Sequence, residues 1–234
     1  MDIQRKLYWL MEAGINCFCA ESPLFFKVSQ KANPTSDETP SATAQAVTFA
    51  SQATTLEHLN QEKQNFNLSS LKKTATHTIF GVGPVHPKLM CVLDMPDGDA
   101  DRIGDPLLGA QADQLKKMMS AIHLDALQDV YVAYLSPWRT PGNRTLTESE
   151  RALFLPFLTQ EIQLVQPQAI LLFGTNLSQI LLKINTLTKA RGAWHTWQNI
   201  PVRVTLALGA LKTTPLRQQA WLDLQEVEKT LSAL

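Results

Sequence analysis

Four short apolar runs alternate with helix-like segments over residues 56–234, and this alternation constrains the fold more than any other feature. The runs are rich in β-branched and aromatic side chains, and each ends at turn-forming residues. They span residues 88–93, 129–135, 168–173 and 200–208. Strands joined by helices of this length run parallel and are covered on both faces. The pattern therefore predicts a three-layer α/β/α fold around a central parallel four-stranded sheet.

The helices between the runs are marked by apolar periodicity and by one clear start signal. Residues 111–124 and 216–231 carry apolar side chains at helical spacing. Thr147 and Glu150 have the spacing of a capping box, which predicts that a long helix begins beside them. In parallel sheets of this kind, functional residues lie beyond the carboxyl ends of the strands. We therefore expect the loops after the four strands to meet and to hold the site.

The first 55 residues differ from the rest in composition. Residues 1–26 contain a predicted short helix at 3–14, followed by an apolar segment. Residues 27–55 are rich in Ser, Thr, Ala, Gln and Pro, and such a segment buries too little apolar surface to become ordered. We interpret 27–55 as a flexible linker, with a compact irregular loop as the alternative, and 56–234 as the folded domain.

The charges balance, with 21 Lys and Arg residues against 21 Asp and Glu residues. This balance excludes a strongly basic nucleic-acid binder, but residues 162–222 hold six Lys or Arg residues and no Asp or Glu. No apolar run reaches the length of a membrane helix, and the N-terminus lacks the apolar core of a signal peptide. We expect a cytoplasmic, bacterial-type monomer without a membrane partner, associated with the nucleoid if it binds DNA.

The motifs in the loops occur in an order that resembles a known family. The first strand is followed by DMPDGDADRIGDPLLG, the second by SPWRTPGNRTLT, and the third lies within LLFGTNLSQILL. The fourth strand is preceded by RGAWHTWQNIPV, and the last helix contains QQAWLDL. Over residues 56–234 this series resembles the uracil-DNA glycosylase superfamily, and in particular its family-4, iron–sulfur type. Its most specific elements are PGNR and RGxWH.

The resemblance implies a chemistry as well as a fold. Members of this superfamily flip a uracil out of the DNA stack and hydrolyse its N-glycosidic bond during base-excision repair. They use a polar or acidic group that positions water, an aromatic ring that stacks on uracil, and an Asn that reads the base. A His stabilises the anionic leaving base electrostatically. The resemblance therefore implies DNA as the partner.

Most of those groups are replaced in this chain. Asp94 stands where the family has a Glu, and Leu107 replaces the stacking Phe. Tyr134 replaces the base-reading Asn, and a phenol cannot offer the paired donor and acceptor of an amide. The family's His falls within residues 206–208, which are apolar, and no His follows His195. The resemblance thus implies that the group stabilising the leaving base is absent.

These positions define the candidate site residues. The candidate water-positioning carboxylates are Asp94 and Asp99. The candidate base pocket consists of Met95, Pro96, Leu107 and Tyr134. The candidate DNA contacts are Arg139, Asn143, Arg144 and Lys212, with turn stabilisation as the alternative for the first three. The Asp-rich loop over 94–105 lacks the full spacing of a calcium loop, so we expect no metal there.

The iron–sulfur cluster of the family needs four soft ligands, normally Cys thiolates. The positions that match later ligands hold Trp138 and Phe154, and the region around Ser69, which matches an earlier one, also lacks Cys. Cys17 and Cys19 form one pair without a second, and the remaining cysteine lies within a predicted strand. We predict that the chain has no cluster and that apolar packing holds this loop instead.

We therefore predict a superfamily member that binds DNA and in which hydrolysis of the glycosidic bond is weakened or lost. Two alternatives stay open. One is an active DNA glycosylase for uracil or another lesion, in which Asp94 and Tyr134 reshape the pocket. The other is a protein-interaction module without a role on DNA, whose candidate partner is a replication or repair protein.

Overall fold

The computed structural model describes residues 41–233. The segment 1–26 with its predicted helix, and residues 27–40 of the predicted linker, lie outside this range. Cys17 and Cys19 also lie outside it. Among the helices of residues 41–233, none is long and apolar enough to cross a membrane.

The centre of the fold is one sheet of five strands, in the order β2-β1-β3-β5-β4. The strands are β1 (Leu89–Leu93), β2 (Val130–Tyr134), β3 (Ala169–Phe173), β4 (His195–Trp197) and β5 (Ile200–Thr205). β1, β2, β3 and β5 run parallel, and each lies within one of the four predicted runs. Every residue of β1, β2 and β3 is buried, so the sheet is covered on both faces, as predicted.

The fifth strand corrects the predicted count of four. β4 pairs antiparallel with β5, and His195 lies opposite Val202. Between the two strands, Gln198 and Asn199 have φ of 46° and 67°. Two consecutive positive φ values are typical of the type I′ turn that closes a two-residue hairpin. The turn carries Gln-Asn rather than the usual Asn-Gly, so its local sequence did not indicate a hairpin.

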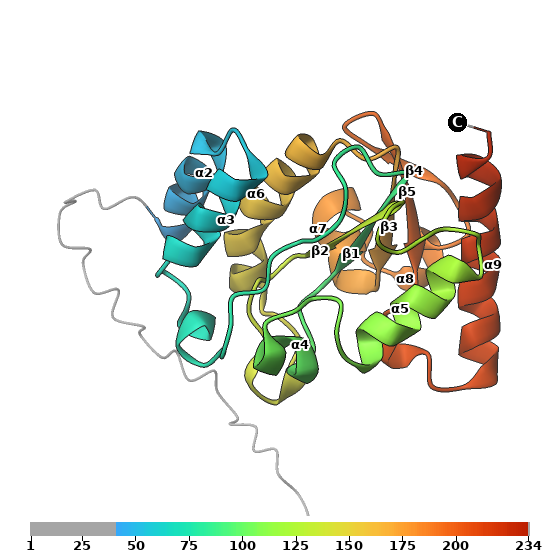
Figure 1. Cartoon of the computed structure of the whole chain (residues 1–234), viewed down its shortest axis with the longest axis horizontal. Coiled ribbons are helices and arrows are strands. Elements are labelled where there is room, and N and C mark those ends of the chain that lie inside the picture. The colour runs from blue at the N-terminus through green and yellow to red at the C-terminus, as the bar shows by residue number, and fades with distance from the viewer. Residues whose placement is uncertain (1–40, 234) are drawn as a thin grey trace, which may run out of the picture. The chain divides into compact units, whose positions relative to one another are not determined.

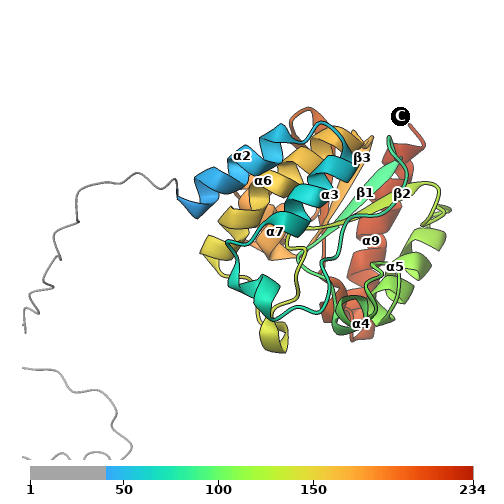
Figure 2. The same ribbon diagram turned by 60° about the vertical axis from the view of Figure 1, so that its left-hand side comes forward.

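Helices form the two outer layers of the predicted α/β/α arrangement (Figures 1 and 2). One side of the sheet carries α2 (Ala42–Gln52), α3 (Leu56–Asn65), α6 (Glu148–Val165) and α7 (Thr175–Leu182). The opposite side carries α5 (Ala110–Ser120) and α9 (Thr214–Leu231). The shorter elements are α4 (Gly98–Ile103), α8 (Leu187–Ala190) and the 3-10 turns η1 (Ser70–Lys73), η2 (Pro141–Asn143) and η3 (Leu208–Ala210).

Helix α2 corrects the predicted linker, because residues 42–52 form part of the core. Ser41 caps the first turn, and Ala46 and Ala50 are buried in the cluster that also contains the apolar face of α6. Phe49 packs edge-to-face on Phe66, with ring centroids 5.9 Å apart. Alanine is the best helix former, and its small side chain allows two helices to pack closely. A segment with few large apolar residues can therefore still pack into the core, and its composition alone does not predict this.

Helix α6 is tied to its neighbours by buried polar groups. Thr147 and Glu150 form the predicted capping box at its first turn. Further along, Lys63 of α3 donates to Glu161 at 2.6 Å, and Tyr131 of β2 donates to the same carboxylate at 3.0 Å. A buried carboxylate needs such partners because desolvation otherwise destabilises its charge. This network fixes α3 and α6 against the sheet.

Candidate active site

The loops after the parallel strands meet at the carboxyl edge of the sheet, as predicted. Asp94 follows β1, and its Oδ2 accepts a hydrogen bond from Nδ2 of Asn176, at the start of α7, at 2.9 Å. The Ser136 N–H, from the loop after β2, donates to the Asp94 carbonyl at 3.0 Å. Gly174, directly after β3, lies so close to Ala207 of the loop after β5 that an added Cβ would approach the Ala207 Cβ to 3.3 Å. Parallel register places all four strand ends together, and Asp94 lies among them.

The pKa of Asp94 is shifted by its surroundings at this edge. Burial raises its pKa, and the hydrogen bond from Asn176 and the charge of Arg151 oppose that rise. Arg151 also donates from Nη1 to the side-chain oxygens of Asn176 at 3.3 Å and Gln179 at 2.9 Å. Within the described chain, Asp94 Oδ1 and Arg151 Nε are buried without a hydrogen-bond partner. A carboxylate with one free buried oxygen is chemically able to accept a proton from water.

Sequence reasoning missed Asn176 and Arg151. Asn176 lies three residues after the last residue of β3, in a loop expected at the site, so its position was an available signal. Arg151 lies in the first turn of α6, where an exposed, solvated arginine is the usual outcome. Only the packing of α6 beside α7 brings its guanidinium to Asn176.

The candidate base pocket is occupied on one side by Tyr134. This residue is 8% exposed, and its hydroxyl donates to the Pro106 carbonyl at 3.1 Å. Burial, with the nearby charges of Asp97 and Asp105, raises the pKa of the phenol, so it stays protonated. Leu107 packs against the apolar core on the α5 and α9 side of the sheet, which also contains Tyr134. The phenol is therefore fixed in place at the position where the resemblance expects the base-reading Asn.

The other two residues of the predicted base pocket lie in the same loop as Asp94. Pro96 is buried, and Met95 is half-buried. The sulfur of Met95 accepts a hydrogen bond from the Thr140 hydroxyl at 3.2 Å. The structure therefore brings the loops after β1 and β2 together around this position.

The Asp-rich loop is largely used to build local structure. Asp97 caps α4 by accepting from two backbone N–H groups, and Asp101 accepts from the backbone N–H groups of residues 76 and 77. Asp99, the second candidate carboxylate, forms an exposed ion pair with Arg102 at 3.0 Å. Within residues 41–233 no group of three metal-binding side chains comes together. The acids of this loop therefore cap a helix, bind backbone N–H groups or form an ion pair.

The PGNR loop lies on the surface beside the acidic loop. Arg139 donates from Nε to Asn143 Oδ1 at 2.6 Å, and its guanidinium lies over Gly98. Arg144 binds Glu150 with both terminal nitrogens, at 2.6 and 2.8 Å. This pairing lowers the pKa of the Glu150 carboxyl to about 2. Turn stabilisation, the alternative given above, thus applies to all three candidate DNA contacts, although residues 141–144 stay exposed.

The basic stretch over 162–222 does not form one surface stripe. Arg191 and Arg203 both contact Asp223, at 2.8 and 3.3 Å, and Arg203 is buried. Their charges therefore hold α9 against α8 and β5. Lys212, the fourth candidate DNA contact, is exposed just after η3, near the carboxyl end of β5.

The loop after β5 carries apolar side chains in the position where the family has its His. Leu206 and Leu208 are buried in the core on the α5 and α9 side. His195, the last histidine of the chain, lies in β4 and contacts the Ala190 carbonyl through Nε2 at 2.8 Å. No imidazole from this loop can therefore reach a leaving base.

Two of the three positions that match cluster ligands form a packed aromatic contact. Trp138 and Phe154 are buried edge-to-face, with ring centroids 5.7 Å apart, and the Trp138 indole N–H donates to Thr78 at 3.0 Å. Ser69 is buried, and its hydroxyl oxygen accepts a backbone N–H. An indole, a phenyl ring and a hydroxyl group are not thiolate donors, so these residues do not fit a cubane cluster. Within residues 41–233, the free cysteine is Cys91, which is buried in β1.

The fold and the site together define a class of protein. It is an α/β/α protein with its polar site beyond the carboxyl ends of parallel strands, built on a β1 carboxylate and an α7 amide. Residues 80–225, more than half of the chain, match the description "Uracil DNA glycosylase superfamily". The chain belongs to this superfamily.

Similar proteins from several organisms agree with this assignment. The chain is 24% identical to the Type-4 uracil-DNA glycosylase of Saccharolobus solfataricus over 188 residues. This aligned region covers 76% of this chain and 87% of that protein. The chain is 27% identical over 142 residues to the protein of the same name from Archaeoglobus fulgidus, covering 58% and 71%. With that of Pyrobaculum aerophilum it shares 26% identity over 170 residues, covering 70% and 86%.

Proposed function

We propose that this protein acts on DNA as a monomeric member of the superfamily, in a DNA-repair setting, with glycosidic hydrolysis weakened or lost. The relatives are named for action on uracil in DNA, which supports DNA as the partner. Basic groups lie beside the carboxyl edge: Arg144 and Lys212 are exposed, and Arg139 is half-buried next to the PGNR loop. Such groups bind phosphate without reading sequence.

One observation carries the loss of activity. Tyr134 lies at the base-reading position, and its hydroxyl is bound to the Pro106 carbonyl. It therefore offers no paired donor and acceptor to a uracil edge. The loop after β5 carries buried leucines and no imidazole to stabilise the leaving base, and removing one such electrostatic donor from an enzyme costs about 10²–10³-fold in rate.

The test is incubation with single- and double-stranded oligonucleotides that contain one uracil, followed by alkaline strand scission. We expect little or no cleavage, and retained binding that weakens steeply as salt rises. An Arg139→Ala, Lys212→Ala double variant should bind less tightly and show a smaller salt dependence. Cleavage at a rate typical of an active glycosylase would refute the loss of activity. No binding at low salt would refute the DNA role.

A second function is favoured by Asp94. Its buried Oδ1 has no partner in the described chain, and burial raises the carboxyl pKa, so the group is able to serve as a base. An altered glycosylase would cleave a deaminated or alkylated base other than uracil. A panel of such lesions tests this, and Asp94→Asn should then abolish cleavage while DNA binding persists.

We also propose that the protein carries no iron–sulfur cluster. The packed pair Trp138 and Phe154 supports this, because two aromatic rings occupy ligand positions. Iron and acid-labile sulfide analysis of the full chain, purified without oxygen, is the test. Stoichiometric iron that a Cys17→Ser, Cys19→Ser variant loses would refute the proposal.

A further inference from the structure

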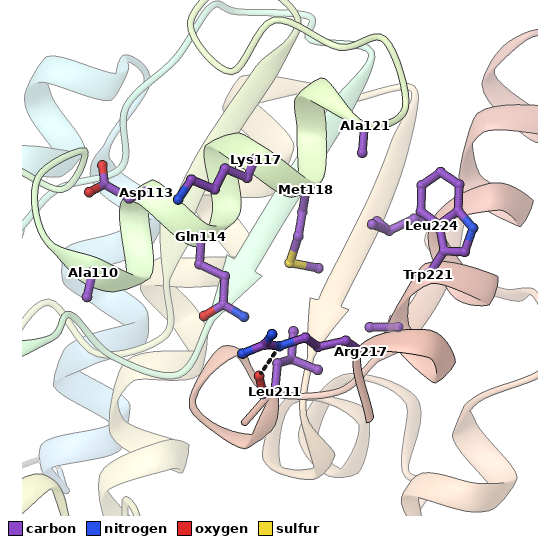
Figure 3. Close-up of a pocket in the computed structure, with 11 residues that line it drawn as sticks. Ala110, Asp113, Gln114, Lys117, Met118, Ala121, Leu211, Arg217, Trp221 and Leu224 are labelled. Carbon is purple, nitrogen blue, oxygen red and sulfur yellow. Dashed lines mark hydrogen bonds between the residues drawn. The ribbon is translucent and has the colours of Figure 1, made fainter. Parts of the chain in front are cut away.

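A groove of about 610 Å³ lies between α5 and α9 (Figure 3). This is the side of the sheet opposite α6. It does not involve Asp94 or the predicted base pocket. One wall comes from α5, over residues 110–121. The other comes from α9 and from Leu211, which follows η3. The groove is separate from the candidate active site, so what it binds is a separate question.

The groove has an apolar floor of largely buried side chains and one exposed aromatic ring beside it. Met118 points from α5 toward the opposite wall, where Leu211 and Leu224 lie (Figure 3). Trp221 of α9 is 39% exposed, although an indole ring is normally covered by protein. Exposed aromatic surface beside a concave apolar strip marks interaction sites more often than scattered apolar residues do.

The charge around the groove is positive. Lys117 on α5 and Arg217 on α9 line it from opposite walls, and both are exposed. Arg217 is oriented by donating from Nε to the Leu211 carbonyl at 3.0 Å. Asp113 is the one carboxylate among its lining residues within the described chain. Lys212, next to Leu211, adds a further exposed cation beside one end.

We propose that this groove binds an amphipathic, acidic peptide helix of a partner protein. Two helices that diverge over an apolar floor can accept the apolar face of a third helix. Acidic residues along the edges of such a helix would face Lys117 and Arg217, which gives orientation and faster association. A single-stranded nucleic acid would use Lys117 and Arg217 for its phosphates, but its backbone would leave Met118 and the apolar floor without an apolar partner, so a peptide helix fits the lining better.

The test uses the full chain and a phage-displayed library of random peptides of helical length. Selection on the wild type is paired with counter-selection on a Trp221→Ala, Arg217→Glu variant. We expect enriched peptides with apolar residues at i, i+3 or i+4 and i+7 and with flanking Asp or Glu. A synthetic copy of the strongest peptide, with a fluorescent label, then gives the affinity by anisotropy.

Trp221→Ala and Arg217→Glu should each weaken that peptide by about tenfold or more, because exposed Trp and Arg residues dominate such interfaces. Leu222→Ala is the matched control: Leu222 is 61% exposed on the same helix and does not line the groove, so its loss should leave the affinity unchanged. Three results would overturn the proposal: no enriched peptide, enrichment of basic peptides, or equal loss in the control. Competition by a single-stranded oligonucleotide would assign the groove to DNA instead.

Discussion

Replacing Trp138 by alanine tests whether packing has taken over the position of a cluster ligand. The side chain is 1% exposed, lies edge-to-face on Phe154 and donates its indole N–H to Thr78. Removing a buried Trp typically lowers the free energy of unfolding by about 3–5 kcal/mol, through lost burial and the cavity left behind. The total free energy of unfolding of a native protein is about 5–15 kcal/mol, so the loss of Trp138 would remove a large fraction of it. At about 2–4 °C per kcal/mol, the melting temperature should fall by about 6–20 °C.

Scanning calorimetry of the wild type and the variant measures this fall. Trp221→Ala is the matched control, since Trp221 is 39% exposed and its loss should cost clearly less stability than the loss of the buried Trp138. Adding iron and sulfide should stabilise neither protein. If Trp138→Ala destabilises no more than the control, packing at this position does not hold the loop and the reasoning fails.

Three further predictions follow from buried or paired groups. Glu161→Gln should lower the free energy of unfolding by about 3–5 kcal/mol, because it leaves Lys63 charged and buried without a partner. A Lys63→Met, Glu161→Leu double variant should regain most of the lost stability. Urea unfolding measures both effects. Gly81→Ala should cost about 1–3 kcal/mol, since its new Cβ would collide with the Glu161 carboxylate, and the midpoint of urea unfolding measures it. Arg144 lowers the pKa of the Glu150 carboxyl from 4.5 to about 2, so the pair stabilises the folded state above pH 4.5 and loses that contribution as pH falls toward 2. Glu150→Gln should therefore lose less stability than the wild type over that interval, and equal loss would contradict the assignment.

The four parallel strands and the long helices could be predicted because their signals are local. Apolar runs of strand length and the Thr147–Glu150 capping box need only neighbouring residues to be recognised. Helix α2 was hidden, because its buried face consists of small alanines that matter only once α6 lies against them. Strand β4 was hidden as well, because three residues and an unusual turn carry little local preference.

The candidate site divides in the same way. The replacements of the family's Asn, His and cluster ligands are matters of residue identity, so Tyr134, the apolar 206–208 loop and Trp138 were available from the sequence. The loop position of Asn176 was available too, but its hydrogen bond to Asp94 and the approach of Arg151 to Asn176 were not, because they join segments far apart in the chain. The positions of the Lys and Arg side chains in the folded protein could not be predicted from the sequence either, because they too depend on tertiary contacts.

By itself, the sequence determined the layer architecture, the family and the chemical groups available at the strand ends. Periodicity and residue identity are properties of short stretches, and short stretches are enough to define them. Only the tertiary structure decided which of those groups meet: Asp94 with Asn176, Arg203 with Asp223, and α5 with α9 around an open groove. Burial and long-range contact set the pKa of a carboxyl and the exposure of a tryptophan, and neither is encoded within one segment.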